Sequence, residues 1–367
     1  FKYQICHVKH HFNFENIFKA ISLSLVVVAF IMEFASSHKK YEKIPDCPHY
    51  HPNSELSSQP GFYPNISNDQ LLAANELIYL IESGKLNFNS GDEVEFLKLL
   101  RFLRARKFHV KNAFKMVEND IKWRAEENRE NLRNEMVDEV LGCNVTDFYK
   151  YFPAWIQGHD KQMRPVSYRQ FGHFEIWNVL KLTSLQKLIR FHSWEAEQAL
   201  RVMNNTSKDT GYNIETFVLV IDAAGWSMKL ATSDAFAFIK GMVSTDADHY
   251  PERLGVLFVI NAPSMLSFAW RIIQGFLDKV TKEKIHILSS DPVEWKPVLL
   301  KYIDEDQIPQ MYGGTAMNLT AEDALLSMNP PQLQPQKVEQ EEMVHVDSKM
   351  EVNTCSSEEE RDDRNTA

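Results

Sequence analysis

Residues 249–263 read HYPERLGVLFVINAP and decide the fold of this chain. The apolar run 256–260 is rich in Val and Ile and lies between Gly255 and Pro263, which is typical of a buried β-strand. Pro263 ends that strand, because proline has no N–H group to donate to a neighbouring strand. A hydrophobic segment follows over residues 264–278, and a second short apolar run ends at Leu288. The stretch therefore predicts a strand, a helix and a further strand.

The helix predicted over residues 264–278 is apolar round most of its circumference. Its polar side chains form one narrow stripe at helical spacing, which consists of Ser267, Arg271, Gln274 and Asp278. A surface helix of a soluble domain normally shows a narrower apolar stripe. Two interpretations stay open: a helix buried deep in a large core, or a lid that covers an apolar cavity and contacts a membrane when it opens.

Four short motifs, in this order and spacing, resemble those of a known family: HYPERLG at 249–255, VINAP at 259–263, GFLD at 275–278 and VTKEKI at 280–285. The family is that of the CRAL-TRIO lipid-binding domain, whose members include transfer proteins for phosphatidylinositol and for α-tocopherol. The likeness runs from about residue 69 to 314, and LRFLRARKF at 100–108 resembles the family's N-terminal helical module. The resemblance implies an α/β fold. It consists of a three-helix module and a mostly parallel sheet, with covering helices and a mobile lid helix over an apolar pocket.

The other elements predicted from the sequence agree with that order. A small helical bundle is expected over residues 67–130. Ser67 and Gln70 form a capping box there, and residues 90–93 repeat the pattern before a second helix. Strands are predicted at 164–169 and 216–222, and helices at 180–204 and 231–243. This alternation predicts parallel pairing with right-handed crossovers, in a lipid-binding domain over residues 131–316.

The two ends of the chain are predicted to lie outside these domains. Residues 1–66 are expected to be a disordered or non-native segment, which ends in a polar, proline-rich linker over 38–64. Within it, residues 20–32 are nearly all apolar but fall short of the ~20 residues that span a membrane. Three interpretations compete: a signal-like or anchoring segment, a stray hydrophobic helix, and an artefact upstream of a start at Met32, which we favour. The acidic tail 317–367 is rich in Pro, Gln, Glu and Ser, which predicts disorder.

Composition limits the classes of function. The chain has 367 residues and a formal net charge of −10, which argues against nucleic acid as a partner. Its cysteines, Cys6, Cys47, Cys143 and Cys355, are scattered and form no CxxC pair, so neither a disulfide framework nor a zinc site is expected. The sequence contains no GxGxxG, phosphate-loop, GxSxG or HExxH motif. We therefore expect a protein that is not an enzyme, without catalytic residues, cofactor or metal.

The resemblance assigns binding of a lipid head group to Arg106, Glu252, Thr281 and Lys284. In members that bind phosphatidylinositol, a carboxylate accepts hydrogen bonds from inositol hydroxyls, while lysine and threonine donate to the phosphate. The guanidinium of Arg106 is always charged and donates two parallel hydrogen bonds, which suits a phosphate. Glu252 and Lys284 have a plainer alternative, a surface ion pair worth under about 1 kcal/mol. The other basic residues of the module are expected to form a solvated face: Lys98, Arg101, Arg104, Lys107, Lys111 and Lys115.

The pocket and its lid are expected to consist of Phe217, Leu219, Met265, Phe268, Trp270, Ile273, Phe276 and Leu277. An apolar pocket suits lipid carriage. A diacyl lipid that leaves a membrane exposes on the order of 30 methylenes to water, at about 0.8 kcal/mol each. A second apolar environment lowers that cost.

The function predicted from these features is intracellular lipid binding and transfer, with phosphatidylinositol as the expected ligand and a membrane surface as a further partner. The protein is expected to act as a cytoplasmic monomer that associates transiently with membranes, or to be membrane-anchored if residues 20–32 are retained. Two alternatives remain. One is a carrier of another hydrophobic ligand, such as a tocopherol-, retinoid- or squalene-like molecule. The other is an interaction adaptor that keeps the fold but transfers no lipid.

Overall fold

The computed structural model describes residues 39–319 apart from 90 and 173, together with Asp323 and Ser327. The predictions for residues 20–32, for a start at Met32 and for most of the tail 317–367 therefore lie outside the described residues. Among the residues that are described, no helix combines the length and the apolar character needed to cross a membrane.

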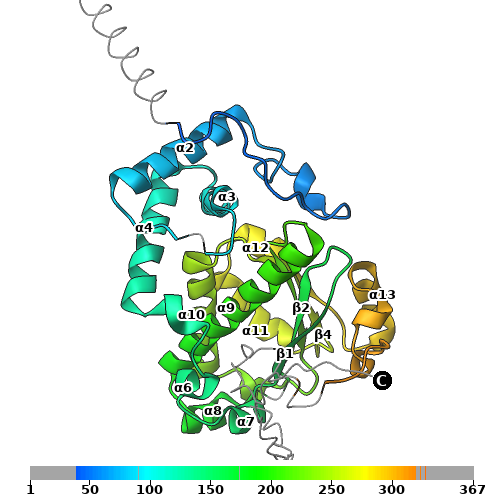
Figure 1. Cartoon of the computed structure of the whole chain (residues 1–367). Helices are drawn as coiled ribbons and strands as arrows, with labels where there is room; N and C mark the ends of the chain where they lie inside the picture. The colour runs from blue at the N-terminus through cyan, green and yellow to red at the C-terminus, as the bar shows by residue number, and fades with distance from the viewer. Residues whose placement is uncertain (1–38, 90, 173, 320–322, 324–326, 328–367) are drawn as a thin grey trace, which may run out of the picture. The chain divides into compact units, whose positions relative to one another are not determined.

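The N-terminal helices form a small bundle with its own apolar core (Figure 1). They are α2 (Asn68–Ser83), α3 (Glu95–Ala105) and α4 (Val110–Glu126), and the short helix α5 (Arg129–Leu132) follows. The predicted capping box of α2 is confirmed: the Ser67 hydroxyl accepts from the backbone N–H of Gln70, and the Gln70 side chain accepts from that of Ser67. The capping box predicted at residues 90–93 is wrong. The N-cap of α3 is Val94, and the Glu93 carboxylate binds arginines instead.

The linker predicted over residues 38–64 is a packed segment where the structure describes it. Cys47, Tyr50 and Tyr63 are buried in the core of the helical bundle, and a 3₁₀ helix, η1 (Glu55–Ser58), lies between them in sequence. The Tyr50 hydroxyl donates to a carboxylate oxygen of Glu215 over 2.8 Å. The prediction failed because a few aromatic side chains anchor this segment, whereas its average composition is polar and proline-rich.

Within the described residues, five strands form one sheet in the order β1-β2-β3-β4-β5. They are β1 (Ala154–His159), β2 (Pro165–Gln170), β3 (Phe217–Asp222), β4 (Leu254–Ile260) and β5 (Ile285–Ile287). β1 pairs antiparallel with β2, and the other pairs are parallel. The α/β class is confirmed. Strand β1 was not predicted, because its residues AWIQGH include a glycine and only one β-branched side chain.

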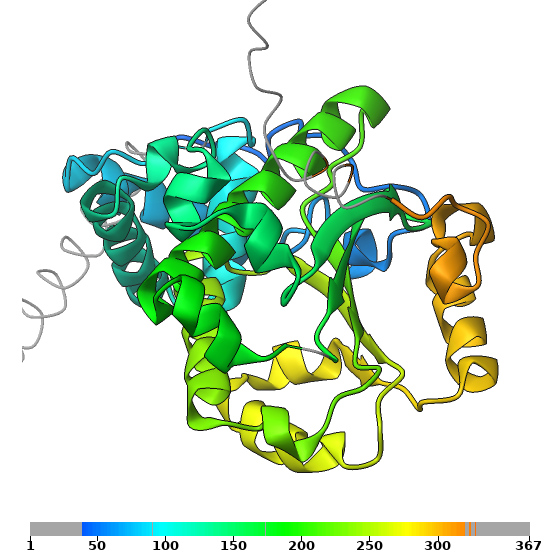
Figure 2. The same cartoon turned by 90° about the horizontal axis from the view of Figure 1, so that it is seen from below.

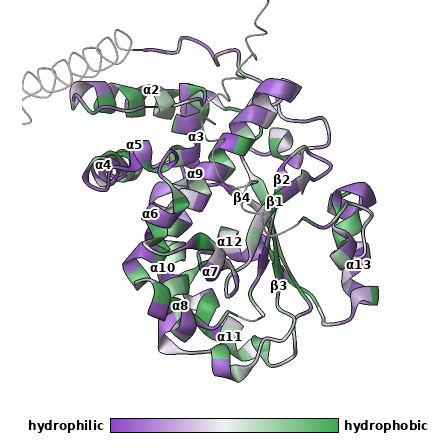
Figure 3. Ribbon diagram, turned by 60° about the horizontal axis from the view of Figure 1, so that its bottom comes forward, coloured by the Kyte–Doolittle hydropathy of each residue, from purple (hydrophilic) through white to green (hydrophobic). Residues whose placement is uncertain are grey.

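The helices of this domain lie on both faces of the sheet, as Figures 1 and 3 show. They are α6 (Val137–Leu141), α7 (Val145–Tyr149), α8 (Ile176–Leu182), α9 (Leu185–Thr210), α10 (Ser233–His249), α11 (Leu266–Ile273), α12 (Lys279–Glu283) and α13 (Pro292–Tyr302). The helix predicted over residues 180–204 is in fact two, because the Ser184 hydroxyl caps a new helix, α9. Helix α13, orange in Figure 2, lies across the sheet from α11 and α12, which are yellow.

The two faces of the sheet differ in how they are covered. Val218 and Val220 of β3 are buried against Trp295 and Leu299 of α13. Since successive side chains of a strand point to opposite faces, the alternate residues of β3 turn toward α9, α10 and α11. On that side the packing is incomplete, and the space forms the cavity described below.

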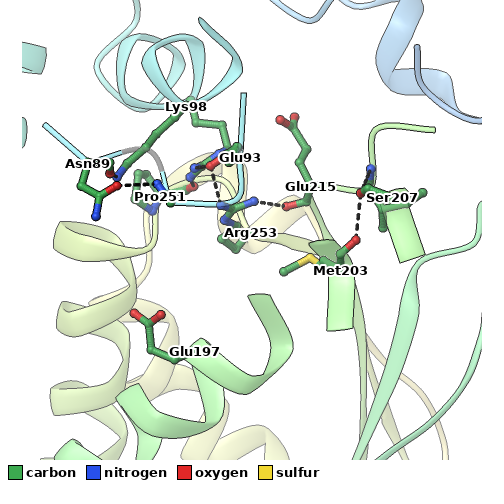
Figure 4. A network of polar contacts seen from close by, with 12 residues as sticks. Asn89, Glu93, Lys98, Glu197, Met203, Ser207, Glu215, Pro251 and Arg253 are labelled. Carbon is green, nitrogen blue, oxygen red and sulfur yellow. Dashed lines mark hydrogen bonds and ion pairs between the residues drawn. The ribbon is translucent and has the colours of Figure 1, made fainter. Parts of the chain in front are cut away.

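A buried ionic network joins the helical bundle to the sheet domain (Figure 4). Arg101 Nε donates to Glu93 over 2.9 Å, Arg253 Nη2 donates to the same carboxylate over 2.9 Å, and Arg101 Nη1 donates to the Pro251 carbonyl over 3.2 Å. Nearby, Arg104 binds Glu215 at 2.7 Å. The prediction of a solvated face is therefore wrong for Arg101 and Arg104, which are buried. Burial alone raises the pKa of Glu93, but the charges of Arg101 and then Arg253 lower it to about 2.

We expect Glu93→Gln to lower the free energy of unfolding at pH 7 by about 3–5 kcal/mol, because it leaves two buried guanidinium groups without their carboxylate. The matched control is Asp92→Asn, whose ion pairs with Arg133 and Lys208 are exposed, and which should cost under about 1 kcal/mol. Chemical denaturation measures both values.

The pH dependence of this difference has a definite sign. The folded-state pKa of Glu93, about 2, lies below its ordinary value of 4.5. Its contribution is therefore complete above pH ~4.5 and is lost as the pH falls toward ~2. Equal losses from both variants, or a difference between wild type and Glu93→Gln that does not shrink in acid, would contradict this role.

Candidate functional site

A cavity of about 630 Å³ lies between the sheet and helices α9, α10 and α11. Its wall on the sheet side comes from alternate residues of the parallel strands: Ser167, Arg169, Phe217, Leu219, Ile221, Leu257, Val259, Ile285 and Ile287. Opposite them lie apolar side chains of the helices, among them Ala199, Met203, Ile239 and Met242. The volume falls within the ~300–1,000 Å³ typical of small-molecule sites.

The expected lid has a different construction from the single helix predicted over residues 264–278. Helix α11 ends at Ile273, a 3₁₀ turn η3 (Gln274–Phe276) follows, and Asp278 caps the next helix, α12. The described wall of the cavity includes four of the expected lid residues, Trp270, Ile273, Phe276 and Leu277.

Met265 and Phe268 do not line the cavity, in contrast to the prediction. Their side chains are 47% and 44% exposed. Ala269, one residue further along the helix, is buried and lines the cavity. The apolar circumference of this helix is therefore divided between an inner surface on the cavity and an outer surface in solvent. The alternative of a helix wholly buried in a large core is excluded.

The four predicted head-group residues border the same cavity, although they come from separate elements. Arg106 is the C-cap of α3, Glu252 lies in the turn before β4, and Thr281 and Lys284 belong to α12 and its C-cap. Glu252 has a positive φ of 61°, a left-handed conformation that is uncommon outside glycine.

The polar contacts of these residues leave hydrogen-bonding capacity for a ligand. Lys284 Nζ donates to the Leu254 carbonyl over 2.9 Å and lies 3.6 Å from Glu252 Oε2. An ammonium has three hydrogens, so this geometry engages only part of its capacity. Glu252 and Lys284 thus form an ion pair, but one that is largely buried at the cavity wall and not on the open surface.

The remaining two head-group residues have carboxylate neighbours. Arg106 Nη2 lies 3.9 Å from Asp248 Oδ1, a long contact. The Thr281 hydroxyl donates to Asp278. Burial tends to raise the pKa of Asp278, but the hydrogen bonds from Thr281 and Val280 outweigh it and hold the pKa below its usual value. The four predicted residues therefore bring two cations, one carboxylate and one hydroxyl to the wall of a largely apolar cavity.

A second group of polar side chains lines the cavity and was not predicted from the sequence: Arg169, His192 and Glu195. His192 and Glu195 are three residues apart on α9, so they lie on one side of the helix, and both are buried. Polar residues on the buried face of an amphipathic helix were the available signal. Within the described part of the chain, no group of His, Cys, Asp or Glu side chains is placed to hold a metal ion.

The parallel sheet, the cavity on one of its faces and the helix that covers it define a class of α/β proteins with an internal apolar pocket. Residues 149–314 match the family model of the CRAL/TRIO domain, and residues 90–119 match that of the CRAL/TRIO N-terminal domain. The chain is 30% identical over 275 residues to the SEC14 cytosolic factor of Kluyveromyces lactis, and the match covers 75% of this chain and 86% of that protein. The chain belongs to the CRAL-TRIO family, as the motifs predicted.

Other comparisons agree with this assignment. The Sec14 cytosolic factor of Schizosaccharomyces pombe is 34% identical over 236 residues, which cover 64% of this chain and 79% of that protein. The phosphatidylinositol/phosphatidylcholine transfer protein SFH12 of Arabidopsis thaliana is 30% identical, over 60% of this chain and 40% of its own length. The solved structure of Sfh5 has the same fold, with a TM-score of 0.55 at 16% identity, and the match covers 74% of this chain and 94% of Sfh5.

The cavity makes a specific prediction about two adjacent residues of β3. In lipid-free protein, Leu219→Trp should change the free energy of unfolding by less than about 1 kcal/mol, because the indole enters empty space. Val220→Trp should cost at least about 1–3 kcal/mol, since Val220 is 1% exposed in the packed layer below α13. Chemical denaturation compares them. Equal costs would mean that the cavity is not open in solution.

Proposed function

We propose that this protein binds phosphatidylinositol and moves it between membranes. The observation that carries the proposal is the cavity of about 630 Å³, whose wall is mostly apolar and whose one end holds Arg106, Glu252, Thr281 and Lys284. Acyl chains would occupy the apolar part and avoid the cost of exposure to water. The head group would meet charged and hydroxyl partners, which a buried phosphate requires.

The polar end of the cavity suits an inositol phosphate in particular. Lys284 has hydrogens left to donate to phosphate oxygens, and Arg106 supplies a second cation whose contact with Asp248 is long and half-exposed. Glu252 supplies a carboxylate, which accepts hydrogen bonds from hydroxyls. A choline head group has no hydroxyl to donate to Glu252, so an inositol lipid fits the set better. The relative SFH12 is named as a transfer protein for phosphatidylinositol and phosphatidylcholine, which agrees with a phospholipid ligand but does not distinguish the two head groups.

The outer surface of the lid would contact the membrane. Phe268 on α11 and Met265 at its N-cap are exposed and do not line the cavity. Exposed aromatic and aliphatic side chains on a helix favour the membrane interface. We propose that the protein works from the cytoplasm as a monomer that docks transiently, with the domain over residues 131–316 holding the lipid and the module over 67–130 contributing Arg106 to the head group.

The rival ligand is a tocopherol-, retinoid- or squalene-like molecule, and the rival class is an adaptor that carries no lipid. Mass spectrometry of lipid that co-purifies with the protein separates the three. Phosphatidylinositol in the preparation supports the proposal, a different hydrophobic compound supports the rival carrier, and an empty, collapsed pocket supports the adaptor.

We expect Lys284→Ala and Glu252→Ala each to weaken phosphatidylinositol binding about ten- to hundredfold, because each removes a charge-assisted hydrogen bond. The matched control is Lys279→Ala on the same helix, whose side chain is 90% exposed. Transfer of labelled phosphatidylinositol between vesicles measures the effect. Normal transfer by both site variants, with folding intact, would reject the head-group assignment.

The outer surface of the lid gives a separate test. Phe268→Asp should weaken association with phospholipid vesicles about tenfold or more, because a buried phenyl group contributes roughly 1.5–3 kcal/mol. Val293→Asp is the control: Val293 is 79% exposed but lies on α13, across the sheet from the lid. Sedimentation with vesicles measures association. Equal binding by the two variants would mean that this surface does not dock.

A further inference from the structure

Arg169, His192 and Glu195 form an inner polar cluster on the cavity wall. Arg169 comes from β2, while His192 and Glu195 come from α9. His192 is 8% exposed and Glu195 3% exposed, so both are removed from solvent. Around them the wall is apolar and includes Phe171, Phe174 and Ala199.

Ion pairs hold this cluster together, but several of its buried polar atoms lack a hydrogen-bond partner of good geometry within the described residues. Arg169 Nη1 lies 3.0 Å from Glu195 Oε2, and His192 Nε2 lies 2.8 Å from Asp246 Oδ1. Arg169 Nε, His192 Nδ1 and both carboxylate oxygens of Glu195 have no hydrogen-bond partner of good geometry in the part of the chain that the structure describes. Buried polar atoms are rarely left without partners in native proteins, because desolvation without compensation is costly.

The charges of the cluster restrict what could fill it. Burial raises the pKa of the Glu195 carboxyl, and the charges of Arg169 and His192 oppose that rise. Asp246, beyond His192, adds a second carboxylate. A phosphate would meet two acidic groups here, and a quaternary ammonium would meet the Arg169 guanidinium. A neutral hydroxyl avoids both repulsions, and it offers one donor together with acceptor lone pairs.

The inner polar cluster is separate from the head-group end of the cavity. On the sheet, Arg169 pairs with Ile221, whereas Leu254, which binds Lys284, pairs with Phe217. Phe217 and Ile221 are four residues apart on β3, so the two polar places are separated by about 13 Å along the strands. One small polar group cannot reach both.

We propose that Arg169, His192 and Glu195 form a second ligand subsite, which binds the hydroxyl group of an otherwise apolar molecule. The hydroxyl donates to Glu195 and accepts from Arg169 Nε, and the rest of the molecule lies against the apolar wall. Such a ligand shares the cavity with the phospholipid proposed above, so the two exclude each other.

The test uses the full chain, stripped of lipid, and two probes that differ in one donor: 1-dodecanol and dodecyl methyl ether. Calorimetric titration should show that the wild type binds the alcohol about tenfold or more tightly than the ether. The double variant Arg169→Met with Glu195→Leu should lose that preference. Replacing a buried ion pair by apolar residues of similar size is often tolerated by the fold.

Lys284→Ala should keep the preference for the alcohol, because Lys284 lies at the other end of the cavity. This variant separates the two proposals, since it impairs phosphatidylinositol transfer only if the head-group assignment holds. A wild type that binds alcohol and ether equally overturns the second subsite even if the double variant fails to fold. A double variant that keeps the preference overturns it too, and the cluster is then a buried ion pair solvated by water.

Discussion

A carboxylate buried between two arginines fixes the geometry on which the rest of the site depends. Glu93 lies between Arg101 and Arg253, and Arg101 also binds the carbonyl of Pro251. Glu252 therefore stands between two residues that are each tied to the helical bundle. A buried ion pair is weak evidence for stability. Here the Glu93 network positions Glu252, which has a left-handed backbone conformation, at the cavity wall. The site is therefore partly preorganised, which lowers the entropic cost of binding a ligand.

The sequence was most informative where hydrophobic periodicity was strong. The apolar run that became β4 and the capping box of α2 could be located from local chemistry alone. β1 and the packed segment around Tyr50 could not. β1 pairs with the next strand, β2, but its own residues have little strand propensity. The segment around Tyr50 is anchored by a partner that is remote in the chain, Glu215. Local propensity contains no information about such partners.

The candidate site likewise has features that the sequence predicted and features that it did not. The family motifs predicted Glu252, Thr281 and Lys284 together as head-group residues, and all three border the cavity. The sequence could not predict which residues of the lid face the cavity and which face solvent. That depends on how the helix is rotated about its axis relative to the sheet, and packing sets this rotation. The inner polar cluster arises only when α9 crosses β2 and brings Glu195 to Arg169. The burial of Arg101 and Arg104 could not be predicted either. A run of basic residues on a helix has the same sequence pattern whether its side chains are solvated or form buried ion pairs with carboxylates.

Helix α11 has eight residues, no side-chain hydrogen bond at its N-cap, and only Ala269 fully buried. An isolated helix of that length does not persist in water, since about 12–15 residues are needed even for favourable sequences. Its order therefore comes from contacts through its inner surface, and those contacts include whatever fills the cavity. The occupant serves as part of the hydrophobic core of the lid. Local unfolding of this segment then requires less free energy when the cavity is empty. Binding of a ligand in the cavity and local unfolding of the lid are therefore thermodynamically coupled.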